Sequence, residues 1–258
     1  MFNKATWLGI KTLVMRDVDR YLKRIWIQTF LPPVVTSFLY FMIFGRVIGS
    51  RLGHMGGTPY ILYIVPGLIM MPVITSAYSN GSFVFFSSKF QRSIELLLMS
   101  PMSNNAILCG FLASSMLRGI IAGVLVFIVS LFFVHFTVAH IFLSLFIMVL
   151  TSLFFAGLGL VNGIFAKSFD SVTIIPTFVL TPLTYLGGVF YSVDLLPHWA
   201  QVITHFNPIF YIVASFKYAL AGIPGAHLLT SIVLLIALNI TVYCVALNTL
   251  KNHSGLRP

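Results

Sequence analysis

Acidic side chains are the first candidates for chemistry, and the 258-residue chain has only five of them. Asp17 and Asp19 fall in a basic N-terminal segment, Glu95 and Asp170 lie in short polar stretches between apolar runs, and Asp194 stands alone. No phosphate-binding loop, nucleophile elbow, zinc-spaced cysteine pair or His-Glu metalloprotease motif accompanies them. We therefore predict no catalytic residue, no metal site and no cofactor-binding site in this chain.

Histidine and cysteine, the other side chains that commonly do chemistry, form no ligand cluster by their spacing. Cys109 and Cys244 lie in or beside apolar runs, where a lone cysteine usually behaves as a small buried hydrophobe. An external metal site or pH sensor is conceivable for the histidines, but ordinary positions at a membrane interface are favoured. Those expected on the outer side are His54, His135, His140, His198, His205 and His227, and His253 is expected inside.

The elements that carry these residues are predicted to be membrane helices. Hydrophobic residues make up 59% of the chain and charged residues 8%, and the mean hydropathy is +1.01. In hydrocarbon every backbone polar group must be satisfied internally, and the long unbroken apolar runs favour helices over barrel strands. The net charge of +10 is scattered between these runs without a nucleic-acid-binding motif, so nucleic acid is not an expected partner.

Charged residues mark the expected limits of the spans, because a charge near the bilayer centre costs several kcal/mol. This rule predicts an all-α protein with six spanning helices. The expected spans are 25–45, about 60–80, two helices within 119–166 that break at 134–140, then 171–193, and a sixth from near 227 to 250.

Lysine and arginine predict the orientation, because they concentrate on the cytoplasmic side of membrane proteins. With both termini in the cytoplasm, 12 basic residues lie inside and 3 outside. The inner ones are Lys4, Lys11, Arg16, Arg20, Lys23, Arg24, Lys89, Arg92, Arg118, Lys167, Lys251 and Arg257, and the outer ones are Arg46, Arg51 and Lys217.

Three segments outside the spans carry recognisable patterns. Residues 4–24 place Trp7, Val14, Val18 and Tyr21 on one helical face, which predicts a helix in the inner headgroup layer, with a plain basic flank as the alternative. Residues 194–222 contain Asn207 as a helix N-cap and Pro208 as a first helical residue. The apolar helix after Pro208 is too short to cross, so we predict outer re-entrant helices.

The third segment, 87–101, follows the second span and is predicted to be one amphipathic helix that Pro101 ends. Lys89, Arg92 and Glu95 are expected on its exposed side. Its apolar face could enter a groove on a soluble partner or simply rest on the membrane. The residues of that face are Phe90, Ile94, Leu97 and Leu98.

Within the spans, one charge and several small residues stand out. Arg118 is placed near the inner end of the third span, where reaching the headgroups is favoured over a substrate role. Small residues four apart allow close helix contact, and internal packing is favoured over dimerisation, although the spacing cannot separate the two. They are Ser115, Gly119, Gly123, Gly159 and Gly163.

Several stretches together resemble the ABC-2 type transporter permeases, the six-span subunits of type V ABC exporters. Within that family the chain is most similar to the YadH-like permeases of the bacterial inner membrane. The resemblance covers essentially the whole chain. It is carried by residues 24–29 with 32–33, 65–70, 89–101, 180–191 and 206–209.

The resemblance implies one transmembrane domain over residues 1–258, with an interface helix at 4–24, a cytoplasmic coupling helix at 87–101 and outer re-entrant helices at 194–222. It also implies a homodimer in the membrane lipid, paired with two copies of a separate ABC ATPase that binds ATP and Mg²⁺. Members of the family export polysaccharides, lipid-linked or lipooligosaccharide substrates, and hydrophobic drugs, and the motifs do not choose among these.

Two other functions are weighed against this one. A secondary transporter or channel needs no ATPase, but ion-coupled carriers usually place acids or broken helices near the midplane, and no such acid is found here. A membrane-embedded transferase needs nucleophiles or metal ligands clustered at one interface, and none is found.

Overall fold

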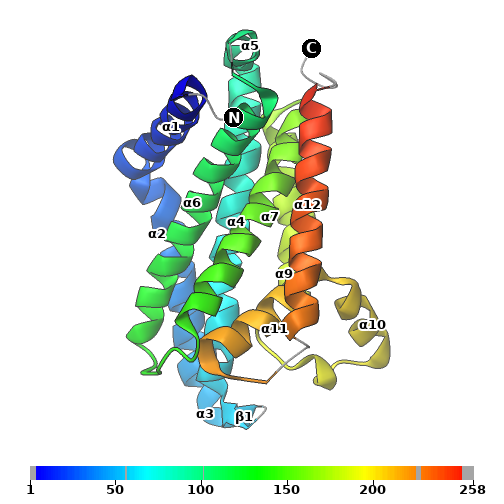
Figure 1. The fold of residues 1–258 in the computed structure, drawn as a ribbon. Coiled ribbons are helices and arrows are strands. Elements are labelled where there is room, and N and C mark those ends of the chain that lie inside the picture. The colour runs from blue at the N-terminus through cyan, green and yellow to red at the C-terminus, as the bar shows by residue number, and fades with distance from the viewer. Residues whose placement is uncertain (1–3, 56, 101, 225–227, 252–258) are drawn as a thin grey trace.

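A computed structural model describes residues 4–55, 57–100, 102–224 and 228–251 (Figure 1). Pro101, His227, His253 and Arg257, which entered the predictions above, lie outside the described residues. The described part is almost entirely helical, apart from a two-residue hairpin of β1 (His54–Met55) and β2 (Thr58–Pro59). The predicted all-α class is therefore confirmed.

Within the described ranges, six helical segments are long and apolar enough to cross a membrane, as predicted. The first joins α2 (Trp26–Tyr40), the π-helical η2 (Phe41–Ile48) and α3 (Gly49–Leu52). The second to fourth are α4 (Tyr60–Phe90), α6 (Asn104–Leu131) and α7 (Ile141–Phe165). The fifth joins α8 (Phe169–Ile175), the π-helical η3 (Pro176–Leu180) and α9 (Thr181–Leu186), and the sixth is α12 (Leu228–Lys251).

Several span limits differ from the prediction, because charges do not mark the helix ends there. The first span continues past Arg46 and Arg51 to Leu52, and the fifth covers Phe169–Leu186 in place of 171–193. α4 continues past residue 80 to Phe90, and α6 begins at Asn104, so that Arg118 lies midway along the helix instead of near its inner end. The loop after α6 does fall at 132–140, where the break was predicted. A charge within a span is compatible with the bundle only because its neighbours are polar, as described below.

α4 is the central helix of the bundle. In its most apolar stretch 78% of the residues are buried, against 11% for the first span and 11% for α12. α4 packs closely against α6 and α7, and glycines make this possible: a Cβ at Gly159 would collide with the Tyr78 carbonyl, and one at Gly163 with the Ser82 carbonyl. Gly119 and Gly123 meet Val73 of α4. The small-residue spacing thus serves internal packing, as predicted.

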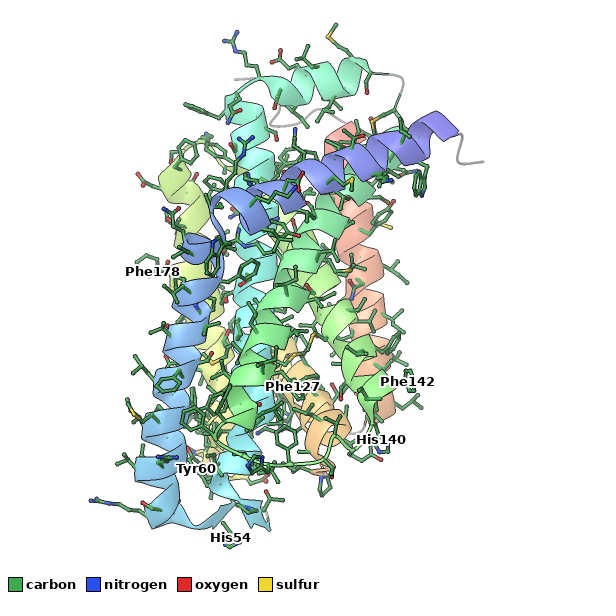
Figure 2. The ribbon with its side chains drawn as sticks, turned by 90° about the vertical axis from the view of Figure 1, so that its left-hand side faces the viewer. His54, Tyr60, Phe127, His140, Phe142 and Phe178 are labelled. Atoms are coloured by element: carbon green, nitrogen blue, oxygen red, sulfur yellow. The ribbon has the colours of Figure 1, made fainter. Side chains whose placement is uncertain are left out.

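The bundle has two distinct ends (Figure 1). One end, here called the terminal end, carries α1 (Lys4–Asp19), α5 (Ser93–Met99) and the last turn of α12. The far end carries α3, η4 (Val193–Leu195), α10 (His198–Phe206) and α11 (Pro208–Ala221). Figure 2 shows Tyr60 and His54 at the far end and α1 crossing the other helices at the terminal end.

α1 is a helix as predicted, and the π-helical turn η1 (Arg20–Arg24) joins it to α2. The face that packs on the bundle is formed by Leu13, Asp17 and Tyr21, which are all buried. Trp7, expected on the same face as Tyr21, is instead 58% exposed. The four-residue spacing of Leu13, Asp17 and Tyr21 explains this, because residues at that spacing lie one above another on a helix.

Candidate functional site

The junction between α4 and α5 differs from the single helix predicted for residues 87–101. α4 ends at Phe90, and Arg92 adopts a left-handed conformation with φ of 56° before α5 begins at Ser93. The Ser93 hydroxyl donates to the Ser88 carbonyl at 3.1 Å, which stabilises the turn. No glycine or proline marks this break, so no local residue pattern predicts the turn.

Because of this turn, the predicted apolar face is not one surface. Ile94 is 1% exposed, and Leu97 and Leu98 pack against the core of the same chain, so none of the three is free to enter a partner's groove. Phe90 belongs to α4, where its ring contacts Phe169 with the centroids 5.2 Å apart.

Lys89 is also not on the exposed side of α5. Its ammonium donates to the carbonyl oxygens of Ile164 and Ala166, at 3.0 and 3.2 Å, at the C-terminal end of α7. A cation there complements the negative end of the helix dipole and satisfies carbonyls that lack partners. Lys89 is therefore a helix cap.

The exposed apolar side chains on α5 and at the adjoining end of α4 are Phe90, Leu96 and Met99, at 67%, 71% and 83% exposure. Arg92 and Glu95, as predicted, are exposed beside them. Sequence reasoning missed Leu96 and Met99, although a signal was present. Residues 94 and 96–99 are all apolar and surround the helix, so burying one face must leave others of them exposed.

At the far end, the predicted helix start at Asn207 and Pro208 is confirmed. The Asn207 side chain accepts from the Ile209 amide at 3.0 Å and donates to the Leu183 carbonyl at 2.6 Å, tying α11 to α9. The other end of α11 is tied to the loop after α6, because the Ala139 amide donates to the Leu220 carbonyl at 3.0 Å. Whether α11 dips into a membrane stays a prediction.

A cavity of about 530 Å³ lies beside α11 and contains an unexpected buried cation. Lys217 is 6% exposed, donates to the Gly188 carbonyl at 2.7 Å and stands 3.5 Å from the centre of the Tyr63 ring. Burial lowers the pKa of Lys217 to about 7. The lysine fixes the left-handed turn at Gly188, which ties α11 to the end of α9.

A second cavity, of about 340 Å³, forms a polar groove between α2 and α4. Here "the polar groove" means the cavity lined by Gln28, Thr29, Pro32, Pro33, Thr36, Ser37, Tyr40, Met71, Pro72, Thr75, Ser76, Ser79 and Arg118. At its far-end limit the Tyr40 hydroxyl lies 2.7 Å from the Tyr185 hydroxyl of α9. Hydroxyl and amide groups therefore line one side of an otherwise apolar bundle, between the mostly exposed first span and the central helix α4.

Arg118 lies at the other end of the polar groove and turns inward. Its Nη1 donates to the Asn80 side-chain oxygen at 3.0 Å, and Nη2 of Arg20 donates to the same oxygen at 3.3 Å. The Asn80 amide nitrogen donates to the Ser115 hydroxyl at 3.2 Å. The predicted role of Arg118 at the headgroups was wrong, because an internal amide solvates it instead. We call Arg20, Tyr21, Asn80, Ser115 and Arg118 the arginine cluster.

Comparisons with known proteins agree over most of the chain. Residues 9–221 match the family described as ABC-2 type transporter. The chain is 46% identical over 252 residues to the inner membrane transport permease YadH of Escherichia coli K12, covering 97% of this chain and 98% of the relative. It is 26% identical over 208 residues to nodulation protein J of Rhizobium leguminosarum bv. viciae, covering 80% and 77%.

Proposed function

The chain belongs to the ABC-2 type transporter family, and from this premise we propose that it is the permease subunit of an ATP-driven exporter. Two copies form the translocation pathway in the bacterial inner membrane, with both termini cytoplasmic. Two copies of a separate ABC ATPase bind ATP and Mg²⁺. The whole chain, 1–258, is one transmembrane domain, and 194–222 forms the outer re-entrant helices.

The polar groove is the observation that carries this proposal. Thr36 is exposed and Ser79 is half-buried, on segments long and apolar enough to span the membrane. Thr75 in the same groove is also half-buried, but its hydroxyl already donates to the Met71 carbonyl at 3.0 Å. A hydroxyl that faces hydrocarbon without a hydrogen bond costs about 1–3 kcal/mol. A second copy that presents the same groove would cover these groups and enclose a polar pathway between the two chains.

The ATPase is proposed to dock at the terminal end, on Phe90, Leu96 and Met99. Large apolar side chains on a short helix outside the bundle are a typical anchor for a groove on a partner protein. Arg92 and Glu95 flank them and would contribute to orientation more than to affinity. Among the other predicted coupling residues, Ile94, Leu97 and Leu98 hold α5 on the bundle.

The alternative, a secondary transporter or channel without an ATPase, has less support. All five carboxylates are among the described residues, and none lies within the middle of a span. Asp170 is in the first turn of α8, and the other four are outside the spans. Coupling to a proton or sodium gradient would need an acid near the midplane.

Purification of the tagged chain from its own membranes tests the proposal. We expect a soluble ABC ATPase to co-purify in equal amount and the complex to hydrolyse ATP in a vanadate-sensitive manner. A chain that purifies without an ATPase and catalyses gradient-driven flux alone in liposomes would establish the alternative instead.

A further inference from the structure

The arginine cluster combines two half-buried cations, neither of which has an ion-pair partner among the described residues. Among the described residues, neither Arg20 nor Arg118 has a carboxylate within 4.0 Å. The carboxylate of Asp17 interacts electrostatically with Arg20, but its closer contacts are with other groups. It accepts from the Ser114 hydroxyl at 3.0 Å and lies 3.6 Å from Nε of Arg16. Two guanidinium groups thus share one neutral amide oxygen.

The cluster also has more donors than acceptors. Within the described part of the chain, Nε of Arg20, Nε of Arg118 and the hydroxyl of Tyr21 are buried without a hydrogen-bond partner. Each buried donor left unpaired costs about 1–3 kcal/mol, more when it is charged. Such groups are rarely kept in a fold without a function, and a charge within a spanning helix is a candidate for one.

The position of the cluster gives it access from two sides. Arg118 lines the polar groove. Arg20 lines a separate cavity of about 550 Å³ at the terminal end, where Arg16 and Arg24 are accompanied by the acids Asp17 and Asp19. Asn80 lies between the two arginines and holds both through its oxygen. A ligand in the groove would therefore reach Arg118 first.

We propose that the arginine cluster binds a phosphate-class oxyanion at the terminal end of the polar groove, with Arg118 and Arg20 as its two cationic ligands. Guanidinium groups bind phosphate in a forked geometry, and two cations match the charge of a phosphate monoester. The ligand is a free phosphate or the headgroup of an amphiphile.

This site deepens the proposed function, because it would hold the acidic group of a substrate where the pathway begins. Its test needs no ATPase, so failure of the site and failure of the exporter assignment are separate results. The probes are dodecyl phosphate and inorganic phosphate, each added at constant ionic strength to the purified full chain in a neutral maltoside detergent. Thermal unfolding is the measurement, since a ligand that binds only the folded state raises Tm.

We expect dodecyl phosphate at millimolar concentration to raise the Tm of the wild type by several degrees. Arg118→Gln and Arg20→Gln should abolish the shift. Lys11→Gln, which removes an exposed charge from α1 at the same end, should keep it. A shift with inorganic phosphate as well identifies a soluble anion as sufficient, and a shift with dodecyl phosphate alone identifies an amphiphile headgroup.

Arg118→Gln and Arg20→Gln each remove one of two neighbouring cations and so relieve their repulsion. The Tm measured without phosphate should therefore stay unchanged or rise. If Arg118→Gln nevertheless fails to fold, Arg118→Lys keeps the charge but loses the forked geometry, and at least half of the shift should disappear. No shift in the wild type with either probe, or a full shift in the Arg118 variant that folds, would overturn the proposal.

Discussion

The ammonium nitrogen of Lys89 lies 3.0 Å from the carbonyl oxygen of Ile164, so the last turn of α4 closes the C-terminus of α7. A second bond to Ala166 at 3.2 Å completes the cap. Lys89 therefore has a structural role: it joins α4 to α7, two helices that pack along most of their length.

Lys89→Met should therefore act on stability more than on partner binding. Hydrogen bonds from a charged group contribute about 1.5–3 kcal/mol, so we expect the Tm in detergent to fall by several degrees. Lys23→Met is the matched control, because Lys23 is exposed and its ion pair with Asp19 is worth about 0–1 kcal/mol. A Lys89→Met protein with normal Tm that no longer retains the ATPase would contradict this assignment.

Substitutions at the exposed residues of α5 should instead act on partner binding more than on stability. Leu96→Asp or Met99→Asp should leave the permease folded but weaken ATPase retention by at least about 2 kcal/mol, roughly 30-fold, because a charge would enter an apolar anchor site. Phe90→Asp should act in the same way. Co-purification of the ATPase and ATP hydrolysis by the complex are the measurements.

The control for this surface is Leu195→Asp, since Leu195 is 70% exposed at the far end and should tolerate the charge without loss of the ATPase. Leu97→Asp should behave differently from Leu96→Asp, because Leu97 packs on the core and its replacement should lower Tm itself. Full ATPase retention by Leu96→Asp and Met99→Asp together would show that the docking surface lies elsewhere.

The contrast between Leu96 and Leu97 illustrates what sequence patterns can predict here. Long apolar runs predicted the six spans, and the Asn207-Pro208 pair predicted a helix start, because both effects are local. The turn at Arg92 is held by a local bond from Ser93 to Ser88 but carries no glycine or proline that would predict it. The inward direction of Arg118 depends on Asn80, which is distant in the sequence, and no local pattern encodes that pairing. The rule that charged residues mark the ends of spans failed at Arg118, because the rule assumes that lipid surrounds the side chain, and here protein surrounds it.

The packing of α7 on α4 depends on Gly159. A Cβ there would collide with backbone atoms of Tyr78, which cannot rotate away, so Gly159→Ala should destabilise the fold by about 1–3 kcal/mol. Gly49→Ala is the matched control. Its Cβ would meet Phe44 and Tyr60 at 3.4 and 3.5 Å, an ordinary contact, and helix propensity favours alanine by about 1 kcal/mol. Equal Tm values for the two variants would refute the close α4–α7 contact.

Cysteine labelling in intact cells tests which end of the bundle faces the cytoplasm and whether α11 returns to the side it left. The background should carry Cys109→Ala and Cys244→Ala, because Cys244 is exposed and Cys109 partly so. Ser50 and Leu195 are exposed at the far end, and Ser168 is exposed before α8. Pro224 is the better reporter after α11, since its neighbour Ile223 is only 4% exposed.

We expect an impermeant maleimide added outside to label Ser50→Cys, Leu195→Cys and Pro224→Cys, and to reach Ser168→Cys only after the membrane is made permeable. The reason is the bias of basic residues toward the terminal end, where lysine and arginine favour the cytoplasm. Labelling of Ser168→Cys and not Ser50→Cys from outside would invert the topology. Labelling of Leu195→Cys from outside but of Pro224→Cys only from inside would mean that α11 crosses the membrane, which would give the chain an odd number of spans.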